Sequence, residues 1–188
     1  MVPLGQAVFL DRDGVVNRAV VRGDKLYSPM SVDEFEFETG AEDAVRRIAA
    51  YAPVVVVTNQ PEVARGRLAV ETLEAMHALI RVRLPVTDVV FCPHDNADAC
   101  ECRKPKPGMI LDACARLGVD PGLSVMVGDQ DRDIEAGRAA GCRTVLISNR
   151  PDRHQIAIGH PGVAPDHRNR TLAEAVPSII KLLGGELP

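Results

Sequence analysis

Short apolar runs alternate with longer segments of helical periodicity along most of the chain. Four consecutive valines, Val54 to Val57, have no polar residue among them, which is typical of a parallel strand covered on both faces. Similar apolar runs predict further strands at residues 7–10, 86–91, 123–127 and 144–147. Apolar residues at helical spacing predict helices at residues 41–50, 70–83, 107–117, 133–140 and 171–183.

This alternation of strands and helices predicts an α/β fold. A mostly parallel central sheet with helices on both faces, a three-layer Rossmann-like sandwich, is the usual arrangement for such a chain. The 188 residues suit a single domain over 1–188, and no insertion is long enough for a large cap domain. Residues 150–169 have weak periodicity, so we expect a surface loop there that leads to a short final strand.

Composition and charge narrow the class of protein. Apolar residues make up 46% and charged residues 26%, as in ordinary globular domains, while aromatic residues are only 3%. A net charge of −4 with scattered Arg and Lys does not favour nucleic-acid binding. No apolar run approaches the roughly 20 residues of a membrane span, and no basic segment precedes the first strand. We therefore expect a cytoplasmic protein with neither a nucleic-acid nor a membrane partner.

Acidic residues follow two of the predicted strands. Residues 11–14, Asp-Arg-Asp-Gly, come directly after the first, and Asp129, with Asp133 four residues on, follows the fourth. Residues two apart in an extended chain point the same way. Asp11 and Asp13 can thus serve one site as nucleophile and as general acid and base. The competing interpretation is a solvated turn, in which Asp and Gly are common.

Other segments supply groups suited to binding phosphate. Thr58, Asn59 and Gln60 place a hydroxyl and two amides after the second strand, and Arg103 and Lys104 supply positive charge. Carboxyl ends of parallel strands share one edge of a sheet, so these groups and the acidic ones should converge there. Mg²⁺ binds carboxylates together with phosphate oxygens, and phosphoryl transfer needs mainly positioning and charge neutralisation. The sequence predicts such a magnesium site.

Three cysteines and one histidine gather in the loop 92–102. They are Cys92, His94, Cys100 and Cys102. A Cys₃His set is a closed tetrahedral zinc site, so we expect a structural zinc ion that shapes this loop and holds Arg103 and Lys104 in place. The alternative is a loop with incidental cysteines. Cys114 and Cys142 lie on predicted core faces, where we expect small buried side chains.

The order of these segments resembles that of the haloacid dehalogenase superfamily of phosphatases. That pattern is Asp-x-Asp-Gly, then Ser/Thr, then Lys, then an acidic motif, each at a strand end, and it covers roughly residues 6–150 here. The resemblance implies roles for the matching residues. Asp11 would attack phosphorus, form an aspartyl-phosphate and bind Mg²⁺, and Asp13 would act as acid and base and offer its backbone carbonyl to the metal. Thr58 and Lys104 would stabilise the phosphoryl group, and Asp129 would complete the magnesium site.

The cysteine loop resembles that of the zinc-bearing phosphatases that act on heptose 1,7-bisphosphate or on histidinol phosphate. Residues 63–66 and 27–40 resemble the heptose enzymes, whereas the five residues between His94 and Cys100 also resemble the histidinol-phosphate enzymes. The resemblance implies hydrolysis of the C7 phosphate of a heptose bisphosphate, a small phosphorylated sugar. Histidinol phosphate or another small sugar phosphate is the alternative substrate. A zinc-stabilised binding module with an inactive phosphatase fold is the non-enzyme alternative.

Several residues near the predicted pocket are candidates for substrate binding. They are Asn59, Gln60, Arg65, Arg103 and Gln130. We expect Arg65 and Arg103 to bind the second phosphate of a bisphosphate, because the planar guanidinium suits phosphate. Arg65 would also repel the cationic amine of histidinol phosphate. Gln130 departs from the heptose enzymes, which often carry Lys at that position.

Overall fold

The computed structural model describes residues 5–148 and 164–185. At its centre lies a six-stranded sheet with the strand order β5-β4-β1-β6-β7-β8. Its strands are β1 (Val8–Leu10), β4 (Val54–Asn59), β5 (Asp88–Cys92), β6 (Val125–Gly128), β7 (Arg143–Ile147) and β8 (His167–Asn169). Every pairing in this sheet is parallel. The predicted α/β class is therefore confirmed.

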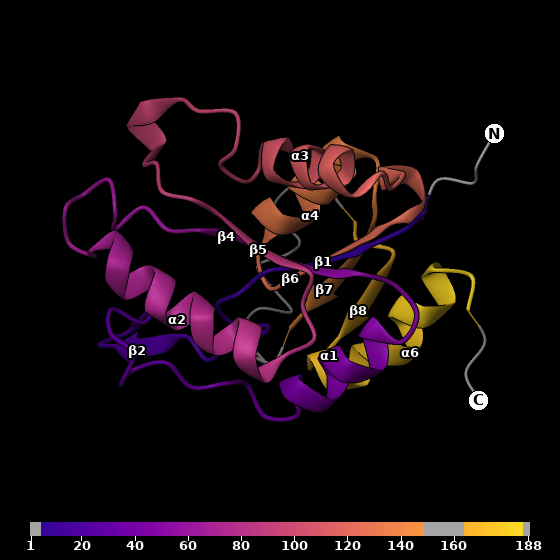
Figure 1. Ribbon diagram of the computed structural model, residues 1–188, viewed down its shortest axis with the longest axis horizontal. Helices are drawn as coiled ribbons and strands as arrows, with labels where there is room; N and C mark the ends of the chain where they lie inside the picture. The colour runs from indigo at the N-terminus through magenta and orange to yellow at the C-terminus, as the bar shows by residue number, and fades with distance from the viewer. Residues whose placement is uncertain (1–4, 149–163, 186–188) are drawn as a thin grey trace.

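Helices cover both faces of the sheet, as Figure 1 shows. On one face lie α1 (Ala41–Ala49), α2 (Val70–Arg83) and α6 (Leu172–Leu182), and on the other lie α3 (Gly108–Leu117) and α4 (Asp131–Ala140). Side chains along β4 alternate between the two faces. Val54 and Val56 pack in the core that contains α1, whereas Val55 and Val57 pack in the core that contains α3. Because both sides of β4 are covered, the run of valines needs no polar residue.

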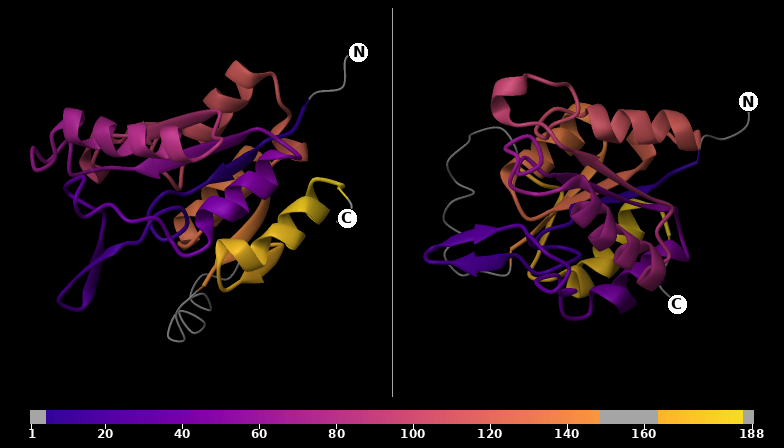
Figure 2. Two further views of the ribbon diagram at one scale, coloured as in Figure 1. Left: turned by 60° about the horizontal axis from the view of Figure 1, so that its bottom comes forward. Right: turned by 60° about the vertical axis from the view of Figure 1, so that its left-hand side comes forward.

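A small antiparallel hairpin was not predicted from the sequence. Its strands, β2 (Val20–Arg22) and β3 (Lys25–Tyr27), project from the body of the molecule in both views of Figure 2. Gly23, at φ 61°, and Asp24 form the two-residue turn between them, a position where left-handed backbone favours glycine. Among the described residues the hairpin is a short insertion and not a large cap domain.

Smaller differences concern the ends of elements. The predicted fourth strand begins at Val125, because residues Pro121–Leu123 form a short 3₁₀ helix, η2. Residues 167–169, the end of the predicted loop 150–169, form the short strand β8, whereas residues 150–163 lie outside the described residues. Cys114 and Cys142 are buried, as predicted. No helix in the described ranges is long and apolar enough to cross a membrane.

Candidate active site

The carboxyl ends of β4, β1 and β6 lie side by side and line a small pocket. The strand order makes β1 the neighbour of both other strands. Asp11, Thr58 and Asp129, which follow or end these strands, line a cavity of about 90 Å³ together with Asp13 and Lys104. The convergence predicted from the strand ends is therefore confirmed. The pocket is polar and small, as a site for a single phosphoryl group would be.

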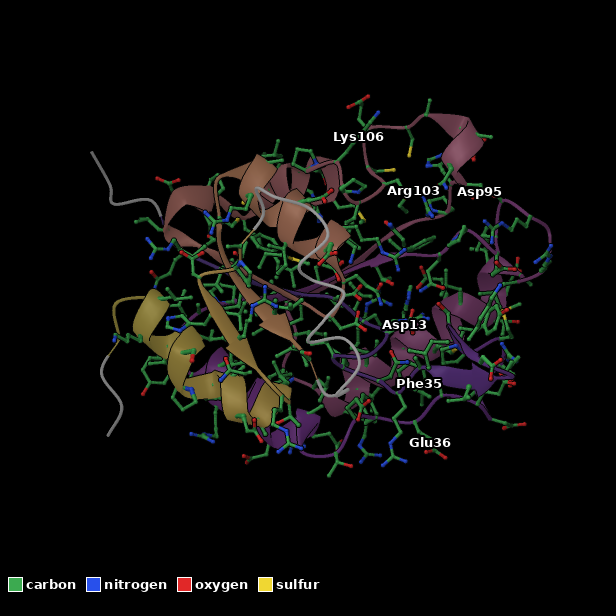
Figure 3. All side chains as sticks on the ribbon, turned by 180° about the vertical axis from the view of Figure 1, so that it is seen from behind. Asp13, Phe35, Glu36, Asp95, Arg103 and Lys106 are labelled. Atoms are coloured by element: carbon green, nitrogen blue, oxygen red, sulfur yellow. The ribbon has the colours of Figure 1, made fainter. Side chains whose placement is uncertain are left out.

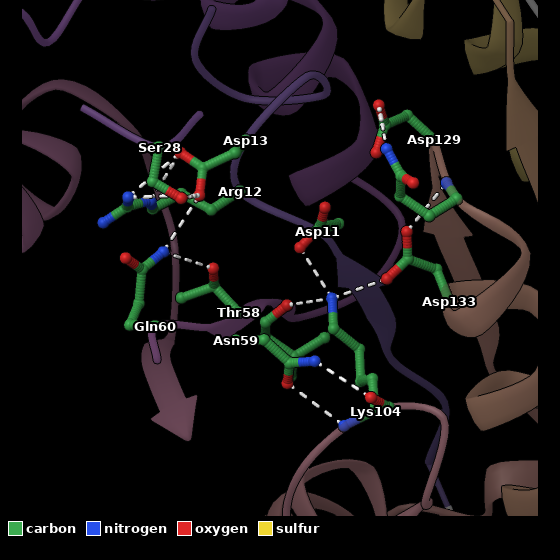
Figure 4. Close-up of polar contacts among 12 residues, drawn as sticks. Asp11, Arg12, Asp13, Ser28, Thr58, Asn59, Gln60, Lys104, Asp129 and Asp133 are labelled. Carbon is green, nitrogen blue, oxygen red and sulfur yellow. Dashed lines mark hydrogen bonds and ion pairs between the residues drawn. The ribbon is translucent and has the colours of Figure 1, made fainter. Parts of the chain in front are cut away.

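Lys104 lies among the carboxylates of this pocket, as Figure 4 shows. Its Nζ is 2.6 Å from Asp11 Oδ1 and 2.7 Å from Asp133 Oδ1, and it donates a hydrogen bond to the carbonyl oxygen of Val57 at 2.8 Å. Burial alone would lower the pKa of Lys104, but the two carboxylates outweigh burial and raise that pKa. Lys104 is therefore a permanent buried cation that offsets part of the local negative charge.

Asp11 has an environment that opposes its ionisation. Burial raises the pKa of Asp11, Asp133 adds repulsion, and Lys104 acts in the opposite direction, so the pKa is about 7. Asp11, Asp129 and Asp133 each place a carboxylate oxygen within 4.8 Å of the other two. Such a group of oxygen donors fits a divalent cation of the Mg²⁺ type. A bound cation would relieve the repulsion that now keeps the pKa of Asp11 high.

The Asp13 carboxylate accepts hydrogen bonds from four side chains. Arg12 and Asn17 donate at 3.0 Å, Ser28 at 2.8 Å and Gln60 at 2.9 Å. Burial would raise the pKa of Asp13, but the charge of Arg12 and these hydrogen bonds outweigh burial and lower it. Asp13 is therefore ionised at neutral pH. It can accept a proton from water directly, and it must first gain a proton before it can donate one.

Arg12 is a fully buried cation that orients Asp13. Its NH1 lies 3.2 Å from His77 Nε2. Because arginine can only donate, Nε2 must accept, and the proton of the neutral imidazole is on Nδ1. Burial and the nearby Arg12 lower the pKa of His77 to about 3. On another side the Arg12 guanidinium lies 6.0 Å from the centre of the Phe35 ring.

Asn59 and Gln60, both predicted substrate contacts, hold other residues of the site. The Asn59 amide donates to the Lys104 carbonyl oxygen at 2.9 Å and accepts from the Lys104 backbone N–H at 3.1 Å. Gln60 is fully buried, and its Nε2 donates to Asp13 and to Thr58 Oγ1, each at 2.9 Å. The Thr58 hydroxyl hydrogen can therefore point toward a ligand. Substrate contact by either amide stays a prediction.

Two glycines allow the acidic side chains to approach closely. At Gly14, with φ +92°, an added Cβ would lie 2.6 Å from Asp129 Oδ2. At Gly128 an added Cβ would lie 2.1 Å from the Cβ of Asp133. Any larger residue at either position would displace a carboxylate, so the glycines fix the shape of the pocket.

Gln130, the N-cap residue of α4, holds two of these carboxylates. The backbone N–H of Gln130 donates to Asp133 Oδ2 at 3.0 Å, and the Gln130 side chain donates to Asp129 Oδ2 at 3.2 Å. Gln130 also lines the small pocket. Through its contacts to Lys104 and to this backbone, Asp133 orients neighbouring groups of the site.

The four residues predicted to bind zinc form one cluster. Cys102 Sγ lies 3.3 Å from Cys92 Sγ, 3.4 Å from Cys100 Sγ and 3.3 Å from His94 Nδ1. A tetrahedral site with Zn–S bonds of about 2.3 Å has ligand-to-ligand edges of about 3.8 Å. A disulfide would instead require about 2.05 Å between sulfur atoms, and all three cysteines are free. The cluster therefore has the composition and spacing of a single tetrahedral metal site.

The same loop carries Arg103 to the mouth of the site. Arg103 donates to Asn96 Oδ1 at 2.8 Å and to the His94 carbonyl oxygen at 3.1 Å. Figure 3 shows Arg103 beside Asp95 on this loop. Arg103 lines a second pocket, of about 350 Å³, which shares residues such as Asn59 with the small one. The shape of the cysteine loop thus determines where Arg103 meets the larger pocket.

Arg65 forms ion pairs with two carboxylates. Its Nε lies 2.7 Å from Asp95 Oδ2, and its NH1 contacts Glu62. Within the described residues, Arg65 is not among those that line either of the two pockets. The predicted contact between Arg65 and a second phosphate stays a prediction, and these ion pairs do not favour it.

Three other arginines line the larger pocket and were missed from the sequence. They are Arg22, Arg67 and Arg132. Arg22 belongs to the hairpin that was not predicted, and Arg132 is an exposed residue in the first turn of α4. Of these three, only Arg67 could have been suspected from the sequence, because it lies two residues after Arg65, a predicted phosphate contact, in the same loop.

Comparison with known proteins gives consistent relatives. A family model described as HAD-hydrolase-like matches residues 101–175. The chain is 38% identical over 152 residues to a D-glycero-alpha-D-manno-heptose-1,7-bisphosphate 7-phosphatase of Mycobacterium tuberculosis, covering 74% of this chain and 78% of the relative. It is 39% identical over 146 residues to the D-glycero-beta-D-manno-heptose-1,7-bisphosphate 7-phosphatase of Pseudomonas aeruginosa, covering 74% and 79%.

Solved structures agree with these sequence matches. The D,D-heptose 1,7-bisphosphate phosphatase of Bordetella bronchiseptica, complexed with magnesium and phosphate, superposes with a TM-score of 0.77 at 34% identity. That match covers 94% of this chain and 98% of the other. A HAD-like phosphatase of Mesorhizobium loti gives a TM-score of 0.75 at 29% identity, covering 98% and 90%.

Proposed function

Because the chain belongs to the heptose-1,7-bisphosphate 7-phosphatases of the haloacid dehalogenase superfamily, we propose that it hydrolyses the C7 phosphate of D-glycero-D-manno-heptose 1,7-bisphosphate. The observation that carries this proposal is the pocket in which Lys104 bridges Asp11 and Asp133. Relatives of similar identity are named for the alpha and for the beta anomer. The proposal therefore concerns the C7 ester in either anomer.

The first half of the proposed reaction transfers the phosphoryl group to the protein. An oxygen of Asp11 attacks phosphorus, and the bond between phosphorus and the C7 oxygen breaks. Asp13, after gaining a proton, gives that proton to the departing oxygen. Lys104 and the Thr58 hydroxyl, both at the pocket wall, donate hydrogen bonds to the phosphoryl oxygens as negative charge develops there.

The second half releases inorganic phosphate. Asp13, now ionised, takes a proton from a water molecule as that water attacks the phosphorus of the aspartyl-phosphate. The bond between phosphorus and Asp11 breaks, and the Asp11 carboxylate is restored. The donors that lower the pKa of Asp13 suit this step, because they favour its ionised form and fix its direction.

Mg²⁺ is the cofactor that the acidic pocket fits. Asp11, Asp129 and the backbone carbonyl of Asp13 would hold the ion, with Asp133 kept close by its contacts to Lys104 and Gln130. When bound, Mg²⁺ neutralises charge on the transferring phosphoryl group. The magnesium and phosphate in the Bordetella bronchiseptica relative support this assignment.

Zinc is the metal that the cysteine cluster fits. Cys92, His94, Cys100 and Cys102 would hold it with no open position, so its role would be structural. A reducing cytoplasm, where thiolate ligands persist, is the location that goes with this proposal. Elemental analysis of protein purified without chelator should give about one zinc per chain. A fully active and equally stable protein without zinc would show that the cluster is incidental.

The proposed substrate can be tested by comparing the turnover of two candidate substrates. We expect a higher kcat/KM for heptose 1,7-bisphosphate than for histidinol phosphate, in the presence of Mg²⁺. Phosphorus NMR of the products should show inorganic phosphate and heptose 1-phosphate. More efficient turnover of histidinol phosphate, or formation of heptose 7-phosphate, would show that the assignment is wrong.

A further inference from the structure

Arg132 lies where the two pockets meet. It lines both the small pocket that contains Asp11 and the larger pocket that contains Arg103. Its side chain extends from the first turn of α4 and is exposed. Arg132 directly precedes Asp133 in α4, so the helix that places one acidic group of the site also places this cation.

Arg132 differs from the other arginines of the larger pocket in having no partner among the described residues. Arg22 forms an ion pair with Glu34 at 2.6 Å, and Arg67 forms one with Glu62 at 3.3 Å. Arg103 is tied by hydrogen bonds to the cysteine loop. An arginine with unused donors at a pocket wall is poised to bind an anion, because no internal contact must be broken first.

We propose that Arg132 binds the phosphate that is not cleaved and thereby selects bisphosphates over monophosphates. This inference rests on the proposed function, since it assumes a substrate with two phosphate groups. The reacting phosphate occupies the small pocket beside Asp11, and the sugar extends into the larger one. The guanidinium of Arg132, at the border of both, then donates two parallel hydrogen bonds to the second phosphate.

Gln130 and Arg65 are less suited than Arg132 to bind the second phosphate. The Gln130 amide donates to Asp129, and it carries no charge to attract a phosphate. Arg65 is held by Glu62 and Asp95, so binding a phosphate would require it to leave two carboxylates. Arg132 is therefore the residue whose removal should affect bisphosphate binding most.

The test compares two substrates that differ only in the second phosphate, heptose 1,7-bisphosphate and heptose 7-phosphate. We expect Arg132→Gln to lower kcat/KM for the bisphosphate by about 10- to 100-fold, as for loss of a charge-assisted contact. The loss should arise mainly in KM, because the reacting groups are unchanged. Activity toward heptose 7-phosphate should change little.

Arg138→Gln is the matched control, because it removes the same charge from the same helix at a site that contacts Ala164 and Asp166. It should leave the ratio of the two kcat/KM values unchanged. Equal losses for both substrates in Arg132→Gln, or no loss for either, would overturn the role of Arg132. A ratio that moves in Arg65→Gln instead would transfer the role to Arg65. A wild-type protein inactive on both heptose phosphates would contradict the proposed function itself.

Discussion

At the scale of single residues, the site depends on side chains that hold other side chains. Asn59 fixes the backbone of Lys104 through two hydrogen bonds, and Gln60 joins Asp13 to Thr58. Arg12 is buried beneath Asp13 and donates to it. These contacts lock the orientation of the reacting groups before substrate arrives, and such preorganisation is a large part of enzymatic rate acceleration.

The double hydrogen bond from Asn59 predicts a loss of activity in Asn59→Ala. Without it the Lys104 backbone loses two partners, and the ammonium group can shift relative to Asp11. We expect kcat to fall by about 10- to 100-fold, as is usual when a catalytic group moves by about 1 Å. Asn59→Asp keeps the oxygen that accepts from the Lys104 backbone N–H, so its kcat in steady-state kinetics should lie between those of the wild type and of Asn59→Ala. An unchanged kcat in Asn59→Ala would show that this contact does not position Lys104.

The buried His77 predicts a distinctive dependence of stability on pH. Its pKa is about 3 in the folded protein and about 6.5 when unfolded. Between these two pH values His77 binds a proton in the unfolded chain but not in the folded protein. The stabilising contribution of neutral His77 is therefore complete above about pH 6.5 and is lost as the pH falls. The loss approaches about 1.4 kcal/mol per pH unit.

Urea denaturation of His77→Gln measures this contribution. The amide oxygen of Gln can still accept from Arg12 but does not titrate. We expect the free energy of unfolding of the wild type to fall more steeply than that of the variant between about pH 6 and pH 4.5. Parallel curves would mean that His77 already gains its proton in the folded state.

Charged residues of the site were easier to predict than the amides. Asp11 and Asp13 stand out because carboxylates after a buried strand have few structural reasons to be there, and Lys104 stands out because it lies just after the cysteine cluster. The internal use of Asn59 and Gln60 could not be predicted, because an amide can donate to substrate or to backbone with no difference in sequence. Arg132 was missed because an exposed arginine in a first helical turn is an ordinary surface residue.

At the scale of elements, the cysteine loop between β5 and α3 connects metal binding to catalysis. Cys92 ends β5, and the residues after Cys102 are Arg103 and Lys104. Lys104 reaches the pocket only because the loop turns back toward β4, where the Asn59 amide forms two hydrogen bonds with the Lys104 backbone. Disorder in the loop would therefore remove both a cation from the small pocket and Arg103 from the larger one.

Cys102→Ser tests this connection. Structural zinc contributes folding free energy, so we expect loss of zinc and a melting temperature lower by more than about 5 °C. We also expect a reduced kcat, because Lys104 is no longer held. Cys114→Ser, which changes a buried thiol outside the cluster, should keep about one zinc per chain. A Cys102→Ser protein with full activity and a wild-type melting temperature would refute a structural role for the loop metal.

Elements with strong periodicity were predicted well, and the hairpin was not. Strands such as β4 are covered on both sides, so their sequences are continuous apolar runs. Strands β2 and β3 are three residues each and mostly exposed, which leaves too few positions for an alternating pattern. Gly23 and Asp24 are residues typical of a two-residue hairpin turn, but they predict a hairpin only where the flanking segments are recognised as strands.

At the scale of the whole molecule, the parallel sheet brings distant segments to one edge. Lys104 lies 2.6 Å from Asp11 although 93 residues separate them in the chain. The strand-end rule was sufficient to predict that Asp11, Thr58 and Asp129 meet in the small pocket. The larger pocket combines the hairpin, the loop after β4, the cysteine loop and α4, and no single rule relates these four segments. Three of its four arginines, Arg22, Arg67 and Arg132, therefore emerged only from the structure.

In the proposed reaction Asp11 is the residue that attacks phosphorus. Asn at this position cannot serve as the nucleophile, but its oxygen can still accept from Lys104, and Asp133 still pairs with Lys104. The most direct measurement is therefore steady-state turnover of heptose 1,7-bisphosphate by Asp11→Asn, with circular dichroism and thermal melting of the same sample. We predict a folded protein whose kcat is lower by at least about 10⁴-fold. A folded variant that keeps about a tenth or more of wild-type activity would show that Asp11 is not the nucleophile.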